Sequence, residues 1–451
     1  MTTVNTRDVI LSVLMDVNKN GRYCHMALHK ALEEHQYLSK RDRAFITRVC
    51  EGTIERMIEI DYIIDQFSTV PSARMKPVIR NILRSAVYQI RFMGGIPDNA
   101  AVNEAVMLAQ HKGFYSLKGF VNGVLRNISR QADAITYPDP EKNPMEYLSV
   151  VYSMPKWIVK YWMDAYGMEI TTLMLKSFME ERPTTVRLKT LHIDKQTILD
   201  SLKEQEIKVK RAPYFPYAYN ISGYNYLPAL EAFKNGWIFP QDVSSMLVAE
   251  IADLHQGDYV IDMCAAPGGK SLHAADKLGG FGMVEARDLS EDKMKLIQEN
   301  IERADLINIK PVQKDALVFD PGSVEKADVV FCDLPCSGLG VIGRKPDIKY
   351  KISMQKIEEL VQLQRSMLHN AASYVRSEGT LIYSTCTVSP LENVENAKWF
   401  ENNYPFHLES IDPYIPRELK RLTTEEGYLQ MMPGLHESDG FFVARFKRDK
   451  E

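Results

Sequence analysis

Residues 260–271 read Val-Ile-Asp-Met-Cys-Ala-Ala-Pro-Gly-Gly-Lys-Ser, and this stretch decides the fold of the second half of the chain. The apolar run predicts a buried strand. The glycines predict a tight turn into a helix, where the backbone can approach a ligand closely. Further strands are predicted at 283–286, 309–312, 328–331, 381–383 and 441–446. Strands that alternate with helical runs indicate a doubly wound, mostly parallel α/β sheet of the Rossmann-like class, which binds ligands beyond the carboxyl ends of its strands.

The first 140 residues show helical periodicity and predict an all-α bundle of about six helices. An apolar stripe of period 3.6 runs from Val78 to Ile90, behind Pro77 in the first turn, and Ser39 with Asp42 marks another helix start. This part carries 18 Lys/Arg and 14 Asp/Glu, a net charge of +4 in a chain whose net charge is −4. A basic module is typical of a protein part that binds a polyanion, but a chance excess of a few basic residues explains the net charge equally well.

Three modules are therefore predicted along the chain. The helical bundle covers residues 1–140, and the X-Pro steps at 137–144 indicate a linker. Residues 141–235 mix helical runs with β-like runs such as 184–188, which predicts a small α+β connecting module. Residues 236–451 form the α/β domain.

Cysteine spacing argues against both disulfides and metal. The six cysteines lie at positions 24, 50, 264, 332, 336 and 386, with no CxxC pair, and the ten histidines form no HExxH motif. No run of 18 apolar residues occurs, and the N-terminus lacks a signal-peptide pattern. The expectation is a reducing, cytoplasmic protein with no membrane segment and no bound metal.

Three cofactor classes compete for the glycine loop. A dinucleotide site requires GxGxxG, which the loop lacks. A phosphate-binding P-loop requires GxxxxGK[ST], but Cys264 stands where its first glycine belongs. S-adenosylmethionine requires a tight turn and a downstream acid, and Asp288 follows Gly268 by 20 residues at the end of the second strand, where an acid meets ribose hydroxyls. Asp288 alone could equally be a helix N-cap, but loop and acid together favour S-adenosylmethionine.

Two cysteines follow neighbouring strands of the predicted sheet. Cys336 lies in Asp333-Leu-Pro-Cys, and Cys386 lies in Ser384-Thr-Cys. A lone free cysteine is usually a small core residue, but two at adjacent strand ends are hard to explain by packing. Cysteine thiolate is a strong nucleophile. One reaction that needs such a group is methylation of cytosine at C5, an unreactive ring carbon. Addition of the thiolate to C6 makes C5 enamine-like and therefore reactive. A second group must then remove the C5 proton, and spacing alone does not rank the two cysteines for these roles.

Other residues complete this chemistry. Asp333 could hold N3 of the ring. Lys270 and Arg344 could steady an anion or the RNA backbone, or be ordinary surface charges. Amino-group methyltransferases carry an aromatic residue where this chain has Cys336, which argues for carbon methylation. The target base must leave its stack, which implies single-stranded or flipped RNA.

These motifs resemble a known family. Residues 264–270, 333–336 and 384–386 look like the signature motifs of the RNA cytosine-C5 methyltransferases of the Nol1/Nop2/Sun group. The segments 239–242 and 438–442 resemble that group's flanking segments.

The N-terminal bundle, with its segment 96–104, is similar to the RNA-binding fold of transcription factor NusB. That combination resembles the bacterial 16S rRNA methyltransferases of the group, over residues 6 to 446.

The resemblance implies roles for individual residues. Cys386 would be the nucleophile, and Cys336 would assist release of the product. The residues implied to contact S-adenosylmethionine are Cys264, Ala265, Ala266, Pro267, Gly268, Gly269, Lys270, Asp288, Asp315 and Asp333. The implied substrate is 16S rRNA, free or in an early-assembling small subunit, at the cytosine numbered 967 in the standard rRNA count.

Three alternatives remain open from the sequence. A tRNA cytosine-C5 methyltransferase would use the same catalytic domain, and only the N-terminal bundle favours rRNA. A catalytically silent RNA-binding or antitermination protein would use the bundle alone, which the intact cysteine motifs argue against. An NTPase is disfavoured by Cys264.

Overall fold

A computed structural model of the protein describes residues 5–189 and 192–450 and divides into two compact units. The first, called here the helical unit, comprises the chain as far as Met179 together with Ile342–Lys351. The second, the αβ unit, comprises Glu180–Val341 and the chain from Ile352 onward. The predicted division into three modules at 140 and 235 stays a prediction.

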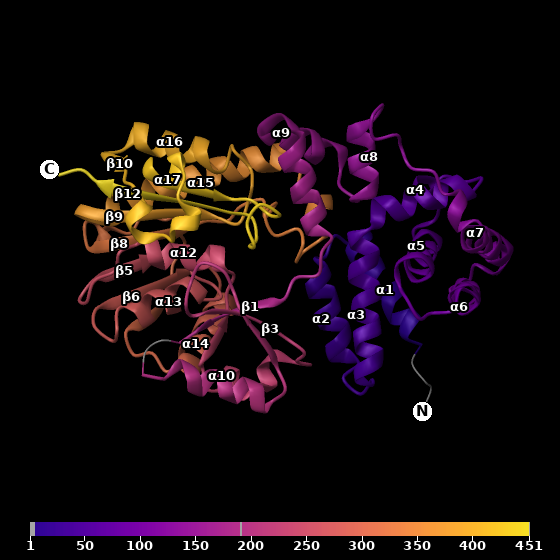
Figure 1. Ribbon diagram of the computed structural model, residues 1–451, viewed down its shortest axis with the longest axis horizontal. Coiled ribbons are helices and arrows are strands. Elements are labelled where there is room, and N and C mark those ends of the chain that lie inside the picture. The colour runs from indigo at the N-terminus through magenta and orange to yellow at the C-terminus, as the bar shows by residue number, and fades with distance from the viewer. Residues whose placement is uncertain (1–4, 190–191, 451) are drawn as a thin grey trace. The chain divides into compact units, whose positions relative to one another are not determined.

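The helical unit contains nine α-helices among its described residues (Figure 1). They are α1 (Thr6–Asn18), α2 (Cys24–Glu34), α3 (Lys40–Glu55), α4 (Met57–Phe67), α5 (Pro77–Phe92), α6 (Asp98–His111), α7 (Lys118–Arg130), α8 (Pro144–Val151) and α9 (Lys156–Phe178). The predicted all-α bundle is confirmed, with Pro77 opening α5 and Ser39 capping α3 through the Asp42 amide at 3.1 Å. Seven helices, not six, fall within residues 5–140, since only Arg56, which is no helix breaker, separates α3 from α4.

Ten residues from the second half of the chain belong to the helical unit. Within Ile342–Lys351, a 3₁₀ turn at Ile348–Tyr350 packs against the helices. Lys349 is buried and donates to the Glu55 carbonyl at 2.7 Å. The Tyr350 hydroxyl donates to the Ile54 carbonyl at 3.0 Å, and the Asp347 carboxylate accepts from the Cys24 amide at 2.9 Å. Helix ends thus gain partners from a distant part of the chain.

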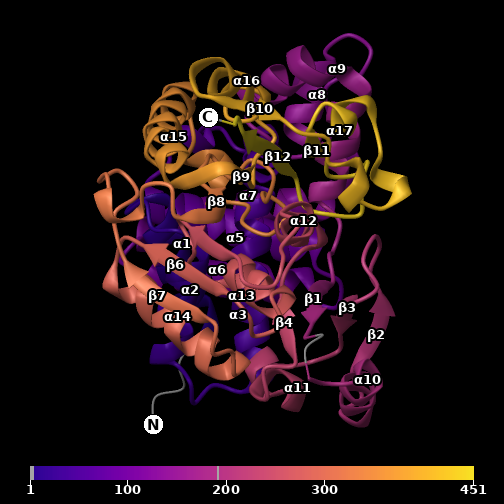
Figure 2. The same cartoon turned by 90° about the vertical axis from the view of Figure 1, so that its left-hand side faces the viewer.

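The αβ unit is built on an eight-stranded mixed sheet in the order β10-β12-β9-β8-β5-β6-β7, with β11 paired to β12. Strand β5 is labelled in Figure 1, and β7 and β11 are labelled in Figure 2. The strands are β5 (Tyr259–Asp262), β6 (Met283–Asp288), β7 (Ile309–Gln313), β8 (Ala327–Asp333), β9 (Val375–Thr385), β10 (Phe406–Leu408), β11 (Tyr428–Met431) and β12 (Phe441–Arg448). The helices are α12 (Val243–Ile251), α13 (Gly269–Lys277), α14 (Glu291–Ala304), α15 (Met354–Tyr374), α16 (Val394–Asn403) and the short α17 (Leu422–Glu425). Strands β5 to β9 pair in parallel and β12 runs antiparallel to β9, which confirms the predicted α/β class.

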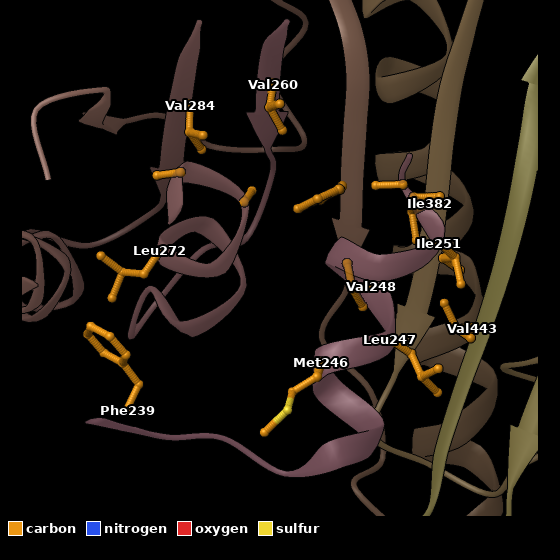
Figure 3. Close-up of a cluster of buried hydrophobic side chains, with 14 of the residues drawn as sticks. Phe239, Met246, Leu247, Val248, Ile251, Val260, Leu272, Val284, Ile382 and Val443 are labelled. Atoms are coloured by element: carbon orange, nitrogen blue, oxygen red, sulfur yellow. The ribbon is translucent and has the colours of Figure 1, made fainter. Parts of the chain in front are cut away.

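The apolar run at 260–263 lies in the middle of this sheet. Val260 and Ile261 on β5 are fully buried, as expected for a strand covered on both faces. Helix α12 packs on one face, and Figure 3 shows its Leu247 and Ile251 beside Val443. Burial on both faces fixes the strand ends rigidly and therefore fixes the loops that follow them.

A smaller antiparallel sheet, ordered β2-β3-β1-β4, lies in the same unit. Its strands are β1 (Thr184–Leu188), β2 (Lys208–Arg211), β3 (Ala218–Ser222) and β4 (Ile238–Pro240), accompanied by α10 (Lys195–Glu204) and α11 (Glu231–Lys234). Arg187 on β1 joins it to α13 through a buried ion pair with Asp276 at 2.6 Å. None of the described helices has the length and apolar character needed to cross a bilayer.

Candidate active site

The predicted site residues follow the carboxyl ends of parallel strands. Register places Asp333 of β8 opposite Ser384 of β9, and Asp262 of β5 opposite Phe331 of β8. The loops after β5, β6, β8 and β9 therefore leave the sheet at one edge. The glycine loop, Asp288, the Cys336 turn and Cys386 all lie at this edge.

The glycine loop is a compact turn that leads into α13. The Gly268 amide donates to the Ala265 carbonyl at 2.7 Å, and Gly268 has a φ of +107°, where a side chain would be strained. The Ala265 amide donates to the Arg287 carbonyl at 2.7 Å and ties the turn to β6. The chain thus turns tightly from β5 into α13, with no side chain at Gly268 or Gly269.

Asp288 braces that loop from the end of β6. Its buried carboxylate accepts from the amides of Ala266 at 3.0 Å and Leu289 at 2.7 Å, and from the Lys293 ammonium at 2.9 Å. The N-cap of α14 is Ser290, so the alternative that Asp288 caps this helix is wrong. Asp315, which follows β7, is half-buried and accepts from the Leu317 amide at 2.9 Å.

Asp262, at the end of β5, is a polar residue of the same sheet edge that no sequence motif singles out. Its carboxylate is buried and accepts from the Ser271 hydroxyl at 2.5 Å. Burial raises its pKa to about 7, although the Ser271 hydrogen bond opposes the change. Its Oδ1 atom is buried and has no hydrogen-bond partner among the described residues. The only signal in the sequence was an acid in an otherwise apolar strand.

The two cysteine sulfurs are adjacent. The Sγ atoms of Cys336 and Cys386 lie 3.3 Å apart, and both residues are half-buried. The hydrogen bond with Cys386 and burial raise the pKa of Cys336 well above its usual range. The two adjacent thiols therefore share one proton, so the pair can carry one negative charge but not two.

A buried polar network holds the residues that follow each cysteine. Glu392 accepts from the Ser337 amide at 2.8 Å and from the Ser337 hydroxyl at 2.5 Å. The Ser337 and Thr387 hydroxyls lie 2.7 Å apart, and Gln364 of α15 donates to Glu392 at 3.1 Å. Burial raises the pKa of Glu392. The sequence alone does not predict this residue, because nothing local marks a glutamate six positions after Cys386.

Two glycines allow the cysteine loops to approach each other. The Gly340 amide donates to the Cys386 carbonyl at 3.1 Å, and the Gly440 amide donates to the Gly340 carbonyl at 2.9 Å. A Cβ on Gly340 would lie 2.1 Å from the Gly440 oxygen, closer than any real contact. Both positions therefore require glycine.

A charged pair lies beside the cysteines. Lys270 donates to Asp333 at 2.7 Å, and the Ser384 hydroxyl donates to the same carboxylate at 2.8 Å. Burial lowers the pKa of Lys270, but Asp333 and Asp262 more than offset it, so the pKa is raised and the ammonium stays charged. Arg344, the other cation considered from sequence, belongs to the helical unit.

The two flanking segments meet in the fold. Asp242 caps α12 and accepts from the Asp439 amide at 3.2 Å. The Asp439 carboxylate in turn pairs with Arg182 at 2.8 Å. A hydrogen bond thus joins residues nearly two hundred positions apart. No cluster of three or more potential metal ligands is found among the described residues.

Comparisons with known proteins identify the parts of the chain. Residues 249–447 match the family model described as 16S rRNA methyltransferase RsmB/F. Residues 4–130 match the NusB family, and residues 154–224 match the ferredoxin-like domain of RsmF/B-like methyltransferases.

Whole proteins match along their full lengths. A protein of Bacillus subtilis named probable ribosomal RNA small subunit methyltransferase B is 33% identical, over 99% of this chain and 100% of its own. A ribosomal RNA small subunit methyltransferase B of Vibrio vulnificus is 29% identical, over 98% of this chain and 99% of its own. The crystal structure of the protein PH0851 covers 99% of each chain with a TM-score of 0.81 and 25% identity. The fold is also shared with NSun6 from Pyrococcus horikoshii, at a TM-score of 0.60 and 24% identity over 67% of this chain and 100% of that one. The chain belongs to the RsmB/F family of methyltransferases, with a NusB domain, a ferredoxin-like domain and an α/β methyltransferase domain.

Proposed function

We propose that this protein transfers a methyl group from S-adenosylmethionine to C5 of a cytosine in 16S rRNA, the one numbered 967 in the standard count. The observation that carries the proposal is the pair of sulfurs 3.3 Å apart at the ends of β8 and β9. The names of full-length relatives, ribosomal RNA small subunit methyltransferase B, support the choice of rRNA.

The residues at the strand ends fit S-adenosylmethionine. We infer that residues 264–270, Asp288, Asp315 and Asp333 hold it. A Cβ on Gly269 would meet no atom within 4 Å, which leaves room for a ligand there, and the orphan Oδ1 of Asp262 just before the loop can accept from a ligand's donor. When bound, this group supplies an electrophilic methyl on a sulfonium sulfur.

In the proposed reaction, Cys386 acts first. Its thiolate forms a bond to C6 of cytosine, and the C5–C6 electron pair moves to C5, which can then accept the methyl group. Asp333 lies beside this cysteine loop with Lys270 and would hold the N3 edge of the ring. The alkylated Cys386 sulfur no longer carries a charge.

Cys336 acts second. Before the addition, its hydrogen bond with Cys386 and its burial keep its pKa high. Once Cys386 is bound to carbon, the contribution of Cys386 disappears and the Cys336 pKa falls. Cys336 can then take the C5 proton, the bond between Cys386 and C6 breaks, and the C5–C6 double bond returns. The assignment of Cys386 as nucleophile rests on the resemblance of its Ser-Thr-Cys motif, because neither spacing nor the mutual contact of the two thiols ranks them.

The test compares four proteins on unmodified 16S rRNA with labelled S-adenosylmethionine. Cys386→Ala should give neither product nor a denaturation-resistant protein–RNA adduct, whereas Cys336→Ala should accumulate the adduct. Cys50→Ala is the matched control, since it removes one sulfur from a buried site in the helical unit and should behave as wild type. An adduct with Cys386→Ala would reverse the two roles.

The same assay addresses the remaining candidates. Labelling of tRNA but not rRNA would keep the chemistry and change the substrate. RNA binding with no labelling by the wild type would leave the silent RNA-binding function, which the NusB domain alone could support.

A further inference from the structure

The helical unit contains a cavity of about 330 Å³ that the proposed chemistry does not use. Residues of α1, α4 and α5 line it together with the 342–351 segment, and its polar members are Asn18, Lys19, Arg80, Arg84, Asp347, Tyr350 and Lys351. A water molecule occupies roughly 30 Å³ in the liquid, so the cavity has room for a much larger polar group.

The cavity carries more positive charge than its carboxylates compensate. Arg84 is engaged by Asp61 through two bonds at 2.7 and 2.5 Å, and Lys351 pairs with Asp347 at 2.9 Å. Arg80 has no such carboxylate, and its buried Nε has no hydrogen-bond partner among the described residues. Lys19, at the C-cap of α1, adds an exposed ammonium.

Arg80 is also placed where a cation destabilises the fold. It lies in the first turns of α5, where the helix dipole is positive, and Arg84 stands four residues further along the same face. Burial and Arg84 lower the pKa of Arg80, and the attraction of Asp61 offsets only part of this effect. An anion in the cavity would remove the remaining cost.

We propose that this cavity binds a backbone phosphate of the RNA substrate, with Arg80 as its principal ligand and Lys19 as a second cation. A guanidinium presents a planar fork of donors that suits phosphate oxygens. Because Tyr350 and Lys351 line the same cavity, an RNA strand bound there lies against residues that follow Cys336 by only 14 and 15 positions. This inference rests on the proposed RNA substrate.

The test uses the full-length protein and unmodified 16S rRNA transcript. Arg80→Gln should weaken RNA binding about tenfold at low salt, the effect of losing one charge-assisted hydrogen bond. It should also lower the slope of log affinity against log salt by roughly 0.7 to 0.9. Arg80→Lys keeps the charge and should recover part of the affinity. Arg41→Gln, an exposed arginine of α3, is the matched control and should change affinity less than twofold.

Thermal unfolding separates a binding role from a structural one. Arg80→Gln should leave the melting temperature unchanged or raise it, because the substitution relieves repulsion. A lower melting temperature, or wild-type RNA affinity, overturns the proposal. Inorganic phosphate that stabilises the wild type but not Arg80→Gln, with RNA affinity equal in both, would assign the cavity to a free anion and also overturn it. If Arg80→Gln loses RNA affinity and the wild type transfers no methyl group, the phosphate site is supported and the proposed function is wrong.

Discussion

Glu392 should control the Cys336 turn without touching the substrate. Its carboxylate accepts from the Ser337 amide, the Ser337 hydroxyl and Gln364. In Glu392→Ala, the Ser337 amide loses its partner in a buried site, which costs roughly 1–3 kcal/mol. The remaining lost bonds and the cavity bring the expected destabilisation to about 3–5 kcal/mol. In Glu392→Gln, the amide oxygen still accepts from Ser337, so the cost should be about 1 kcal/mol.

Denaturant unfolding gives these stabilities, and single-turnover methyl transfer gives the functional effect. If Glu392 positions Cys336, Glu392→Ala should still form the Cys386 adduct but release product at least tenfold more slowly, so the adduct accumulates. Glu392→Gln should restore most of the release rate. A merely structural role would slow adduct formation and release together, or change stability alone, and either result would refute the positioning argument.

Three further predictions concern stability. Burial raises the Asp262 pKa from 3.8 to about 7. Protonated Asp262 therefore contributes to the free energy of unfolding below pH 4, and this contribution is lost as the pH rises through about 7. Asp262→Asn should therefore flatten the pH dependence of unfolding and raise stability at pH 8 by up to about 4 kcal/mol. Asp276→Ala should lower the free energy of unfolding in denaturant by about 3–5 kcal/mol, because it leaves Arg187 buried without its carboxylate partner. Replacing both Arg187 and Asp276 by apolar residues should cost far less. Equal costs for the single and the double replacement would contradict this reasoning. Gly340→Ala should lower the melting temperature and abolish methyl transfer, since its Cβ would lie 2.1 Å from a backbone oxygen, while Gly94→Ala, with open space around it, should behave as wild type.

Much of the fold was predictable because its signals are local. The buried strand at 260–262 and the glycines after it lie in one stretch, and both fold and loop follow from them. The adjacency of Cys336 and Cys386 followed from a general rule, since the carboxyl ends of neighbouring parallel strands meet. Prediction succeeded wherever one segment, or one rule of sheet topology, carried the information.

The parts that could not be predicted depend on contacts distant in sequence. Glu392 is a site residue only because the fold brings it to the Ser337 amide, 55 residues away. The burial that raises the Asp262 pKa comes from the surrounding sheet and helices and leaves no mark on its neighbours in sequence. The membership of residues 342–351 in the helical unit was hidden for the same reason, because their partners lie about three hundred residues earlier.

That exchanged segment limits how the protein can be divided. Lys349 and Tyr350 are held by the carbonyls that end α3, so the helical unit is completed by chain translated long after it. A fragment ending at Met179 would expose the surface that these ten residues cover. A fragment starting at Glu180 would carry Lys349 and Tyr350 exposed in the connection between β8 and α15. Bisection of the gene at the apparent domain boundary should therefore yield two halves that work better together, supplied in trans, than either does alone.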